Sequence, residues 1–379
     1  MRSSSRGEVA PFIVMDVMEQ ARALEAAGRS IIHMEVGQPG TSAPQRARQA
    51  LAQAMESDAL GYTVALGLPE LRAGIADLYR DWYGVDLDPG RVVITAGSSA
   101  AFVLAFTALF EAGEAVGVTE PGYPSYRQIL KSLSLTPHAI PTQSETRHVP
   151  ELPDENLAGL IVASPANPTG TMLSRGDLER LIAACQARDV AFISDEIYHG
   201  VQYDGRAISA LEISDDVYVI NSFSKYFSMT GWRLGWMVVP EDHVRRIERL
   251  AQNMFICAPH AAQIAALGAL QARDETETML QVYAENRRLM LDGLPRAGCD
   301  KIAPPDGAFY IYADVSEHTQ DSLAFAAEIL NEAGVAVTPG LDFDPVRGHR
   351  TLRFSYARAT SDIVEGLQRL TRFMAERAK

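Results

Sequence analysis

The chain has 379 residues, of which 47% are hydrophobic and 22% are charged, and its formal net charge is −14. This composition is ordinary for a globular protein with room for about two domains, and the acidic balance argues against binding of nucleic acids or anionic membranes. The three cysteines, Cys185, Cys257 and Cys299, are far apart and show no metal-site spacing. They indicate free thiols in a reducing cytoplasm.

No segment resembles a secretory leader or a membrane span. Residues 1–9 are polar and basic, and no long apolar stretch follows them. The apolar stretch at residues 100–110 is too short to cross a bilayer. We therefore expect a cytoplasmic protein that has neither a membrane nor a nucleic acid as a partner.

The first part of the chain predicts a helix over residues 11–27 and a strand over residues 31–35. From residue 91 to residue 239, short apolar runs alternate with helical patterns. The expected strands are 91–95, 115–119, 157–163, 190–194, 217–220 and 234–239, and the expected helices are 98–110, 125–135 and 174–188. Ser174 and Asp177 form a capping-box pattern at the start of the last helix. Such alternation favours an α/β fold whose mostly parallel sheet is covered by helices on both faces.

Beyond residue 285 the pattern changes to that of a smaller α+β unit. A half-exposed strand is expected over residues 307–315 and a helix over residues 321–332. Two further strands, 335–338 and 351–356, precede a final helix over residues 361–379. The early helix and strand could belong to either unit on these grounds alone.

The first cluster of polar residues follows the strand 91–95. In open α/β sheets, ligands bind beyond the carboxyl ends of the strands. Gly97-Ser98-Ser99 opens a helix here, so its free N–H groups could bind a phosphate, or a serine could simply cap the helix. The motif is neither a Walker A loop nor GxGxxG. Without GxGxxG, a nicotinamide dehydrogenase is disfavoured.

Three later strand ends carry further chemistry: Ser164-Pro-Ala-Asn167-Pro-Thr-Gly170, Ser194-Asp195-Glu-Ile-Tyr198 and Asn221-Ser222-Phe-Ser224-Lys225, the last followed by Arg233. The chain has only four lysines, so a lysine at a strand end is notable. A phosphorylated pyridine aldehyde needs this combination. Its phosphate needs donors from arginine, serine and the backbone, and its ring nitrogen needs a carboxylate. Its phenolic oxygen needs donors from an amide and a phenol, and its aldehyde needs a lysine with which to react.

Taken together and in this order, these motifs resemble those of the class I and II aminotransferases, which are fold-type-I enzymes that use pyridoxal 5′-phosphate. Further matching motifs are Val36-Gly37-Gln-Pro-Gly, Tyr62-Thr, Gly67-Leu-Pro-Glu-Leu-Arg72, Glu120-Pro-Gly-Tyr123-Pro, Met229-Thr-Gly-Trp-Arg233-Leu-Gly and Arg353-Phe-Ser-Tyr-Ala. The resemblance extends from about residue 30 to residue 358, which is nearly the whole chain.

The resemblance implies a cofactor site built from many motifs: Gly97, Ser98, Ser99, Tyr123, Asn167, Asp195, Tyr198, Ser222, Ser224, Lys225 and Arg233, with Tyr62 from the partner subunit. Lys225 is expected to form the aldimine with the cofactor. Asp195 is expected to pair with the ring nitrogen, and Asn167 and Tyr198 to bind the phenolic oxygen. A neutral lysine is needed, so its usual pKa of about 10.4 has to be lowered by burial and nearby cations.

The other implied roles concern the ring face, the phosphate and the substrate. Tyr123 stacks on the ring. The backbone amides after Gly97 hold the phosphate together with Ser222, Ser224 and Arg233. Arg353 binds the substrate α-carboxylate as a bidentate fork. Gly37 and Asn167 lie beside that carboxylate.

The resemblance also implies a homodimer with shared active sites, a large domain over residues 46–284, and a small domain formed by residues 1–45 and 285–379. The expected substrates are an amino acid and a 2-oxo acid. His199 stands beside Tyr198, and we expect it to be non-catalytic. The histidines show no metal-site spacing, so no catalytic metal is expected.

Of two alternatives to a transaminase, an enzyme with a different reaction at the same site remains open and a non-enzymatic regulator is disfavoured. The same cofactor site serves β-elimination C–S lyases and aminocyclopropane-carboxylate synthases, because fold does not fix chemistry. A cofactor-sensing regulator is disfavoured, because it needs a DNA-binding module for which this acidic chain has no room.

The donor preference is expected to be for neutral aliphatic or aromatic amino acids over aspartate. Thermophilic-type aspartate-specific members have a lysine where this chain has the segment 96–99. The segment Met254-Phe-Ile-Cys-Ala-Pro259 is also apolar, whereas such members tend to be polar there. An unpaired carboxylate would be costly to desolvate in such a pocket.

Overall fold

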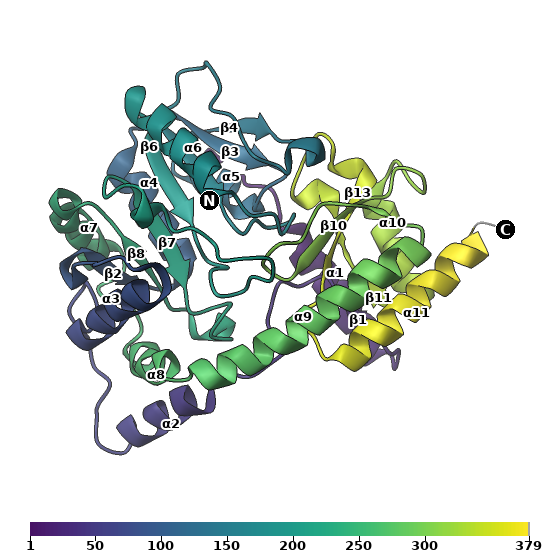
Figure 1. Cartoon of the computed structure of the whole chain (residues 1–379), viewed down its shortest axis with the longest axis horizontal. Helices are drawn as coiled ribbons and strands as arrows, with labels where there is room; N and C mark the ends of the chain where they lie inside the picture. The colour runs from purple at the N-terminus through teal and green to yellow at the C-terminus, as the bar shows by residue number, and fades with distance from the viewer. Residues whose placement is uncertain (378–379) are drawn as a thin grey trace.

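A seven-stranded sheet forms the centre of the larger part of the molecule (Figure 1). The structure, a computed structural model, describes residues 1–377. The strand order is β2 (Val92–Thr95), β8 (Gly235–Val238), β7 (Tyr218–Ser222), β6 (Ala191–Asp195), β5 (Gly159–Ala163), β3 (Ala115–Glu120) and β4 (Thr136–Pro141). Only β8 runs against the others, pairing antiparallel with both β2 and β7. The predicted α/β class and mostly parallel sheet are confirmed.

Successive side chains of a strand point to opposite faces of the sheet. Both faces carry apolar side chains here, so helices cover both. On β2, Val93 packs in one core cluster and Val92 and Ile94 pack in another. The first cluster holds the buried sides of α4 (Gly97–Leu109), α5 (Pro124–Ser132) and α7 (Glu241–Met254). The second holds those of α3 (Pro69–Tyr83), α6 (Arg175–Ala187) and α8 (His260–Leu270), and α2 (Gln45–Ala54) packs on α8.

The smaller part contains a four-stranded antiparallel sheet in the order β12 (Thr338–Pro339), β13 (Thr351–Ser355), β10 (Tyr310–Asp314) and β9 (Lys301–Ile302). Its helices are α10 (Ser322–Glu328) and α11 (Thr360–Arg377). The 24-residue helix α9 (Arg273–Arg296) runs from the larger part to the smaller one (Figure 1).

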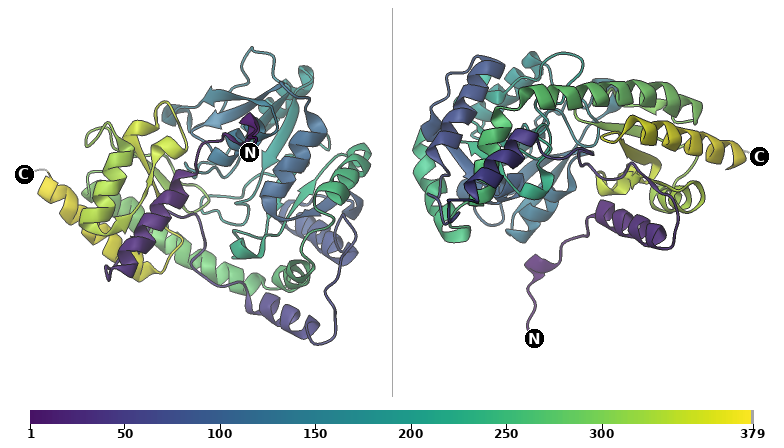
Figure 2. Two further views of the ribbon diagram at one scale, coloured as in Figure 1. Left: turned by 180° about the vertical axis from the view of Figure 1, so that it is seen from behind. Right: turned by 90° about the horizontal axis from the view of Figure 1, so that it is seen from below.

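The N-terminal elements lie with the C-terminal part of the chain, which the sequence left open. Strand β1 (Ile32–His33) pairs in parallel with β11 (Val335–Ala336). Helix α1 (Ile13–Ala26) packs against β11 and β12. Figure 2 shows the exposed segment before α1 projecting away from the body of the molecule.

Short turns complete the described chain. The 3₁₀ turns are Ser5–Gly7, Pro89–Arg91, Ser144–Thr146, Ala210–Glu212, Thr230–Trp232, Gly340–Asp342 and Gly348–Arg350, and a π-helical turn, Ile329–Ala333, follows α10. No helix within residues 1–377 is long and apolar enough to cross a membrane.

Two predicted elements needed correction, and strand β4 was missed. Strand β4 was not expected, because Pro137, His138 and Pro141 interrupt its apolar pattern; it is an edge strand, where missing N–H donors and polar side chains are tolerated. The expected strand 335–338 is split between β11 and β12, which belong to different sheets. The predicted helix 321–332 is α-helical only to Glu328. The Ser174 capping box is confirmed, and residues 378–379 of the last predicted helix lie outside the described residues.

Candidate active site

A cavity lies at the carboxyl ends of β2, β3, β5, β6 and β7, where residues of α1, β10 and β13 close it. Eleven of the fourteen residues predicted for the site line this cavity: Gly37, Ser98, Ser99, Tyr123, Asn167, Asp195, Tyr198, Ser224, Lys225, Arg233 and Arg353. Parallel strands end at one edge of a sheet, which is why motifs more than a hundred residues apart meet here.

Lys225 follows the end of β7 and points into the cavity. Its Nζ donates a hydrogen bond to the carbonyl oxygen of Gly37 at 2.6 Å. Burial lowers the pKa of Lys225 to about 7, and the nearby guanidinium groups of Arg353 and Arg233 act in the same direction. These are the two causes that the sequence analysis required. The amine is therefore partly neutral near pH 7.

Asp195 is the last residue of β6 and is buried at the floor of the cavity. Its Oδ1 accepts a hydrogen bond from the backbone N–H of Ile197 at 3.1 Å, and its Oδ2 accepts one from the hydroxyl of Tyr126. Burial raises the pKa of Asp195 to about 6. The carboxyl group is still mostly ionised at pH 7, so it is suited to pair with a cationic ring nitrogen.

Arg353 projects from β13 with only 2% of its surface exposed. Its guanidinium lies between the rings of Tyr310 and Phe343, 4.3 and 4.6 Å from their centroids. Nη1 donates to Oδ1 of Asn167 at 2.8 Å, and Nη2 donates to the carbonyl oxygen of Glu35. Nε is buried without a hydrogen-bond partner. A fixed, buried guanidinium with a donor to spare is suited to a carboxylate.

The first turn of α4 and the guanidinium of Arg233 form a cradle for an anion. Helix α4 begins at Gly97, its N-cap residue is Ala96, and no side chain caps the first turn. This excludes the simple cap by Ser98 or Ser99 and leaves the N–H groups available. Gly97 has φ +76°, and a Cβ there would lie 2.5 Å from Nη2 of Arg233. The positive φ favours glycine here, and a side chain at this position would displace the Arg233 guanidinium.

Serines of the lysine motif differ in their placement. Ser224 lines the cavity, whereas Ser222 does not. The hydroxyl of Ser222 donates to the carbonyl oxygen of Leu234 at 2.9 Å and lies 2.7 Å from the hydroxyl of Ser224. Gly97 does not line the cavity either, but it lies next to the guanidinium of Arg233, which does.

Tyrosines form one wall of the cavity. The hydroxyls of Tyr198 and Tyr310 are 2.7 Å apart, and a Cβ on Gly37 would lie 1.9 Å from the Tyr310 hydroxyl. Tyr123 is the N-cap residue of α5, and its ring packs edge-on against Phe12 at 5.9 Å. Glycine at position 37 is thus required by the close approach of Tyr310.

Tyr62 is the predicted residue that lies apart from the cavity. Its side chain is 83% exposed on the segment between α2 and α3. Other exposed apolar side chains occur nearby in the sequence, at Met55 and Val64, and on the segment before α8, at Phe255 and Ile256. The two segments meet, because Nδ1 of His260 lies 3.0 Å from the carbonyl oxygen of Gly61.

Sequence reasoning missed the wall that α1 contributes. Phe12, Val14 and Met15 line the cavity, although they are more than 80 residues from the Gly97-Ser98-Ser99 motif. The apolar segment 254–259, which supported the predicted donor preference, does not line the cavity. The apolar character of the pocket therefore has a different source from the one expected.

Tyr126 and Tyr310 were also missed. Tyr126 lies one helical turn beyond Tyr123 on α5, so the i, i+3 spacing could have indicated it. Tyr310 had no comparable signal, because its strand alternates like any half-exposed strand.

The donor set suits pyridoxal 5′-phosphate. The uncapped helix with Gly97 and Arg233 fits a phosphate, the buried Asp195 fits a cationic ring nitrogen, and Lys225 offers a neutral amine. Arg353 remains at the other end of the cavity for a carboxylate.

Comparisons with known proteins agree with this geometry. The family model for aminotransferase class I and II matches residues 29–370. The valine–pyruvate aminotransferase of Mycobacterium tuberculosis is 46% identical over 378 residues, which cover 97% of each chain. A crystal structure of an aminotransferase from Mycobacterium tuberculosis has a TM-score of 0.97 at 45% identity and covers 99% of this chain and 100% of that chain. Another crystal structure, of a protein from Silicibacter pomeroyi, has a TM-score of 0.94 at 64% identity, with coverage of 99% and 100%.

Proposed function

Because the chain belongs to the aminotransferase class I and II family, it transfers amino groups with pyridoxal 5′-phosphate, and we propose that Lys225 is the residue that carries this transfer. The observation that carries the proposal is the lowered pKa of Lys225, about 7, in a cavity that also holds a carboxylate and two guanidinium groups. When bound, the cofactor supplies an aldehyde for the amino group and a ring that withdraws electrons from the substrate α-carbon.

The chain's own residues divide the remaining tasks. Neutral Nζ of Lys225 takes a proton from the substrate α-carbon and, with the cofactor bound, would deliver it to the former aldehyde carbon of the cofactor. The ionised carboxylate of Asp195 holds a proton at the ring nitrogen. The hydroxyl of Tyr126 donates to Asp195 and favours its ionised form.

Other residues bind the cofactor and orient it. The N–H groups at the start of α4 hold the phosphate together with Ser224 and Arg233, and Ser222 supports Ser224. Since Oδ1 of Asn167 accepts from Arg353, its amide nitrogen is the donor for the phenolic oxygen of the cofactor. Tyr198 is the second donor to that oxygen, and Tyr123 covers the ring face.

The substrate is a neutral amino acid whose α-carboxylate binds Arg353 beside Gly37 and Asn167. Among the described residues that line the cavity, the cations are Lys225, Arg233 and Arg353, and each already has a role. Phe12, Val14 and Met15 offer an apolar wall to the side chain. The name of the valine–pyruvate aminotransferase from Mycobacterium tuberculosis supports valine as donor and pyruvate as acceptor.

The protein acts as a cytoplasmic homodimer with a large domain over residues 46–284 and a small domain from residues 1–45 and 285–379. Exposed apolar side chains around Tyr62 support the dimer, because a monomer rarely leaves several such groups together in water. Tyr62 then reaches the phosphate of the other subunit. Mixing an inactive Lys225→Ala protein with an inactive Tyr62 variant tests this, since exchanged subunits form one intact site per heterodimer.

The role of Lys225 is tested with Lys225→Ala and borohydride reduction. The wild-type protein is expected to give a lysine adduct that peptide mass spectrometry locates at residue 225, and the variant to lose turnover by at least about 10³-fold. Lys301→Ala is the matched control, because Lys301 is exposed and pairs with Glu317. Normal turnover in Lys225→Ala, or an adduct at another lysine, would contradict the assignment.

A further inference from the structure

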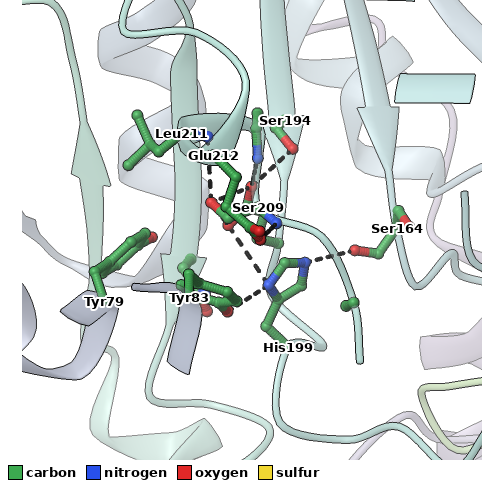
Figure 3. Close-up of polar contacts among 12 residues, drawn as sticks. Tyr79, Tyr83, Ser164, Ser194, His199, Ser209, Leu211 and Glu212 are labelled. Atoms are coloured by element: carbon green, nitrogen blue, oxygen red, sulfur yellow. Dashed lines mark hydrogen bonds and ion pairs between the residues drawn. The ribbon is translucent and has the colours of Figure 1, made fainter. Parts of the chain in front are cut away.

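A buried polar cluster lies behind the cavity, between the turn that follows β6 and helix α3 (Figure 3). The turn directs its residues to two sides. Asp195 and Tyr198 line the cavity, whereas Glu196 and His199 are buried on the far side. His199 therefore lies next in the chain to a cavity residue without lining the cavity itself.

His199 joins two segments of the chain through its two ring nitrogens. Nε2 lies 2.9 Å from the carbonyl oxygen of Ser164, and Nδ1 lies 2.5 Å from the hydroxyl of Tyr83 (Figure 3). A carbonyl oxygen only accepts, so Nε2 carries the proton that bonds to it. Burial lowers the pKa of His199 to about 4, so the ring is neutral and Nδ1 accepts from Tyr83.

Glu196 does not change this assignment, although its Oε2 lies 3.6 Å from Nδ1 of His199. That separation is longer than a hydrogen bond. The carboxyl group instead accepts from the hydroxyls of Ser194 and Ser209 and from the backbone N–H of Ala210, at 2.8–3.1 Å. The remaining charged neighbours, Arg206 and Glu212, pair with each other at 2.6 Å.

The bond to Ser164 ties together the two segments that carry Asn167 and Tyr198. Ser164 begins the loop that contains Asn167, and its backbone N–H donates to the carbonyl oxygen of Asp195 at 3.2 Å. His199 adds a second link between the same segments, beside Tyr198. We propose that His199 is a positioning residue that fixes the separation of Asn167 and Tyr198 through its hydrogen bond to Ser164. This inference rests on the proposed roles of Asn167 and Tyr198 as donors to one cofactor oxygen.

The separation matters because two donors can serve one oxygen only within a narrow range of geometry. Donors to the phenolic oxygen of the cofactor stabilise its negative charge. The adjacent nitrogen, through which Lys225 would be bonded to the cofactor, then loses its proton more readily, and its pKa falls. If the donors drift apart, the pH at which the visible absorbance band changes should rise. The midpoint of that spectral titration therefore reports on the positioning independently of turnover.

The test compares two substitutions that keep different halves of the histidine. His199→Gln places an amide nitrogen at the position of Nε2, so the bond to Ser164 can form. His199→Asn places its amide at the position of Nδ1, which keeps the contact with Tyr83 and loses the bond to Ser164. We expect His199→Asn to raise the spectral midpoint by about 0.5–1 pH unit and His199→Gln to stay within about 0.3 unit of the wild-type holoenzyme.

Melting temperatures of both holoenzymes separate positioning from stability. Equal loss of stability in both variants with a midpoint shift only in His199→Asn supports the proposal. Unchanged midpoints in both, or equal shifts in both, overturn it. If His199→Asn does not fold, His199→Leu takes its place, because leucine keeps the bulk of the side chain and loses the bond to Ser164; an unchanged midpoint in His199→Leu overturns the proposal.

Tyr198→Phe distinguishes this inference from the roles on which it rests. It removes one proposed donor directly and should raise the midpoint at least as much as His199→Asn. If Tyr198→Phe leaves the midpoint unchanged, the proposed role of Tyr198 is wrong. If Tyr198→Phe shifts the midpoint and His199→Asn does not, only the positioning role of His199 is wrong.

Discussion

At one end of the cavity, Arg233 lies over Gly97 and the first turn of α4; at the other end, Arg353 lies between the rings of Tyr310 and Phe343. The Arg233 side chain is exposed, whereas Arg353 is 98% removed from solvent. The Arg233 end takes its remaining donors from the first turn of α4 and from the hydroxyl of Ser224. The Arg353 end is assembled from side chains and carbonyl groups of four separate segments.

This difference predicts at which end of the cavity a substitution should reduce activity more. Interactions of an exposed charge are weakened by water and salt. At the Arg233 end, the helix N–H groups also bind the anion, so Arg233 supplies only part of the binding free energy. Interactions of a buried guanidinium are stronger, and truncating it leaves the partner groups unsatisfied. We therefore expect larger effects at the carboxylate end than at the phosphate end.

The largest effect is expected from Arg353→Lys. Lysine cannot make the bidentate fork or fill the space between the two rings, so kcat/KM for the amino acid should fall by about 100-fold, mainly through KM. Steady-state kinetics at saturating cofactor measure this. Arg350→Lys is the control, since Arg350 lies just before the same strand and its side chain is 47% exposed. Equal efficiency of Arg353→Lys and the wild type would break the comparison.

A second effect concerns the side chain of the amino donor. An apolar side chain gains roughly 1.5–3 kcal/mol on burial, which corresponds to a factor of about 10 to 100. With pyruvate as the fixed acceptor, kcat/KM for valine should exceed that for aspartate by a factor in this range. Alanine and phenylalanine measured alongside show how much of the gain comes from size. A preference for aspartate would point to a cation from outside the described lining of the cavity.

A smaller effect is expected from Arg233→Lys at the phosphate end. A lysine keeps the positive charge, and the first turn of α4 still offers its N–H groups. The dissociation constant of the cofactor should rise by about tenfold, while kcat at saturating cofactor changes by less than about threefold. Cofactor release during dialysis, followed by absorbance, checks this. A loss of kcat/KM at saturating cofactor as large as that of Arg353→Lys would remove the distinction between the two ends.

The last effect is on the stability of the protein freed of cofactor. The pKa of Lys225 is about 7 when folded and near 10.5 when unfolded, so the unfolded chain binds more protons between these values. The free energy of unfolding therefore rises with pH in this window, by up to about 1.4 kcal/mol per pH unit from this group. Lys225→Met should be the more stable protein at pH 7, and its advantage should shrink by pH 9. Urea unfolding of both proteins measures the difference, and a constant difference would mean that the lysine pKa is not lowered.

The sequence by itself determined the class of fold and most of the candidate site. Apolar runs of strand length alternating with helices predict a parallel sheet, and the residues after each strand are then gathered by the geometry of the sheet. Lys225, Asp195, Asn167 and Ser98 could be predicted for this reason, since each lies at or just beyond a strand end. Local signals also predicted the Ser174 capping box.

Only the tertiary structure decided which segments close the cavity. Phe12 is the N-cap residue of α1, which precedes every strand of the chain, and it reaches the cavity because α1 packs against β11 and β12 near the other end of the chain. Tyr310 and Phe343 also come from other segments than Arg353: Tyr310 lies on β10, which pairs with β13, and Phe343 follows the turn Gly340–Asp342. Strand β4 was missed because an edge position tolerates prolines that argue against a central strand. Contacts of this kind depend on burial between distant segments, and no spacing along the chain encodes them.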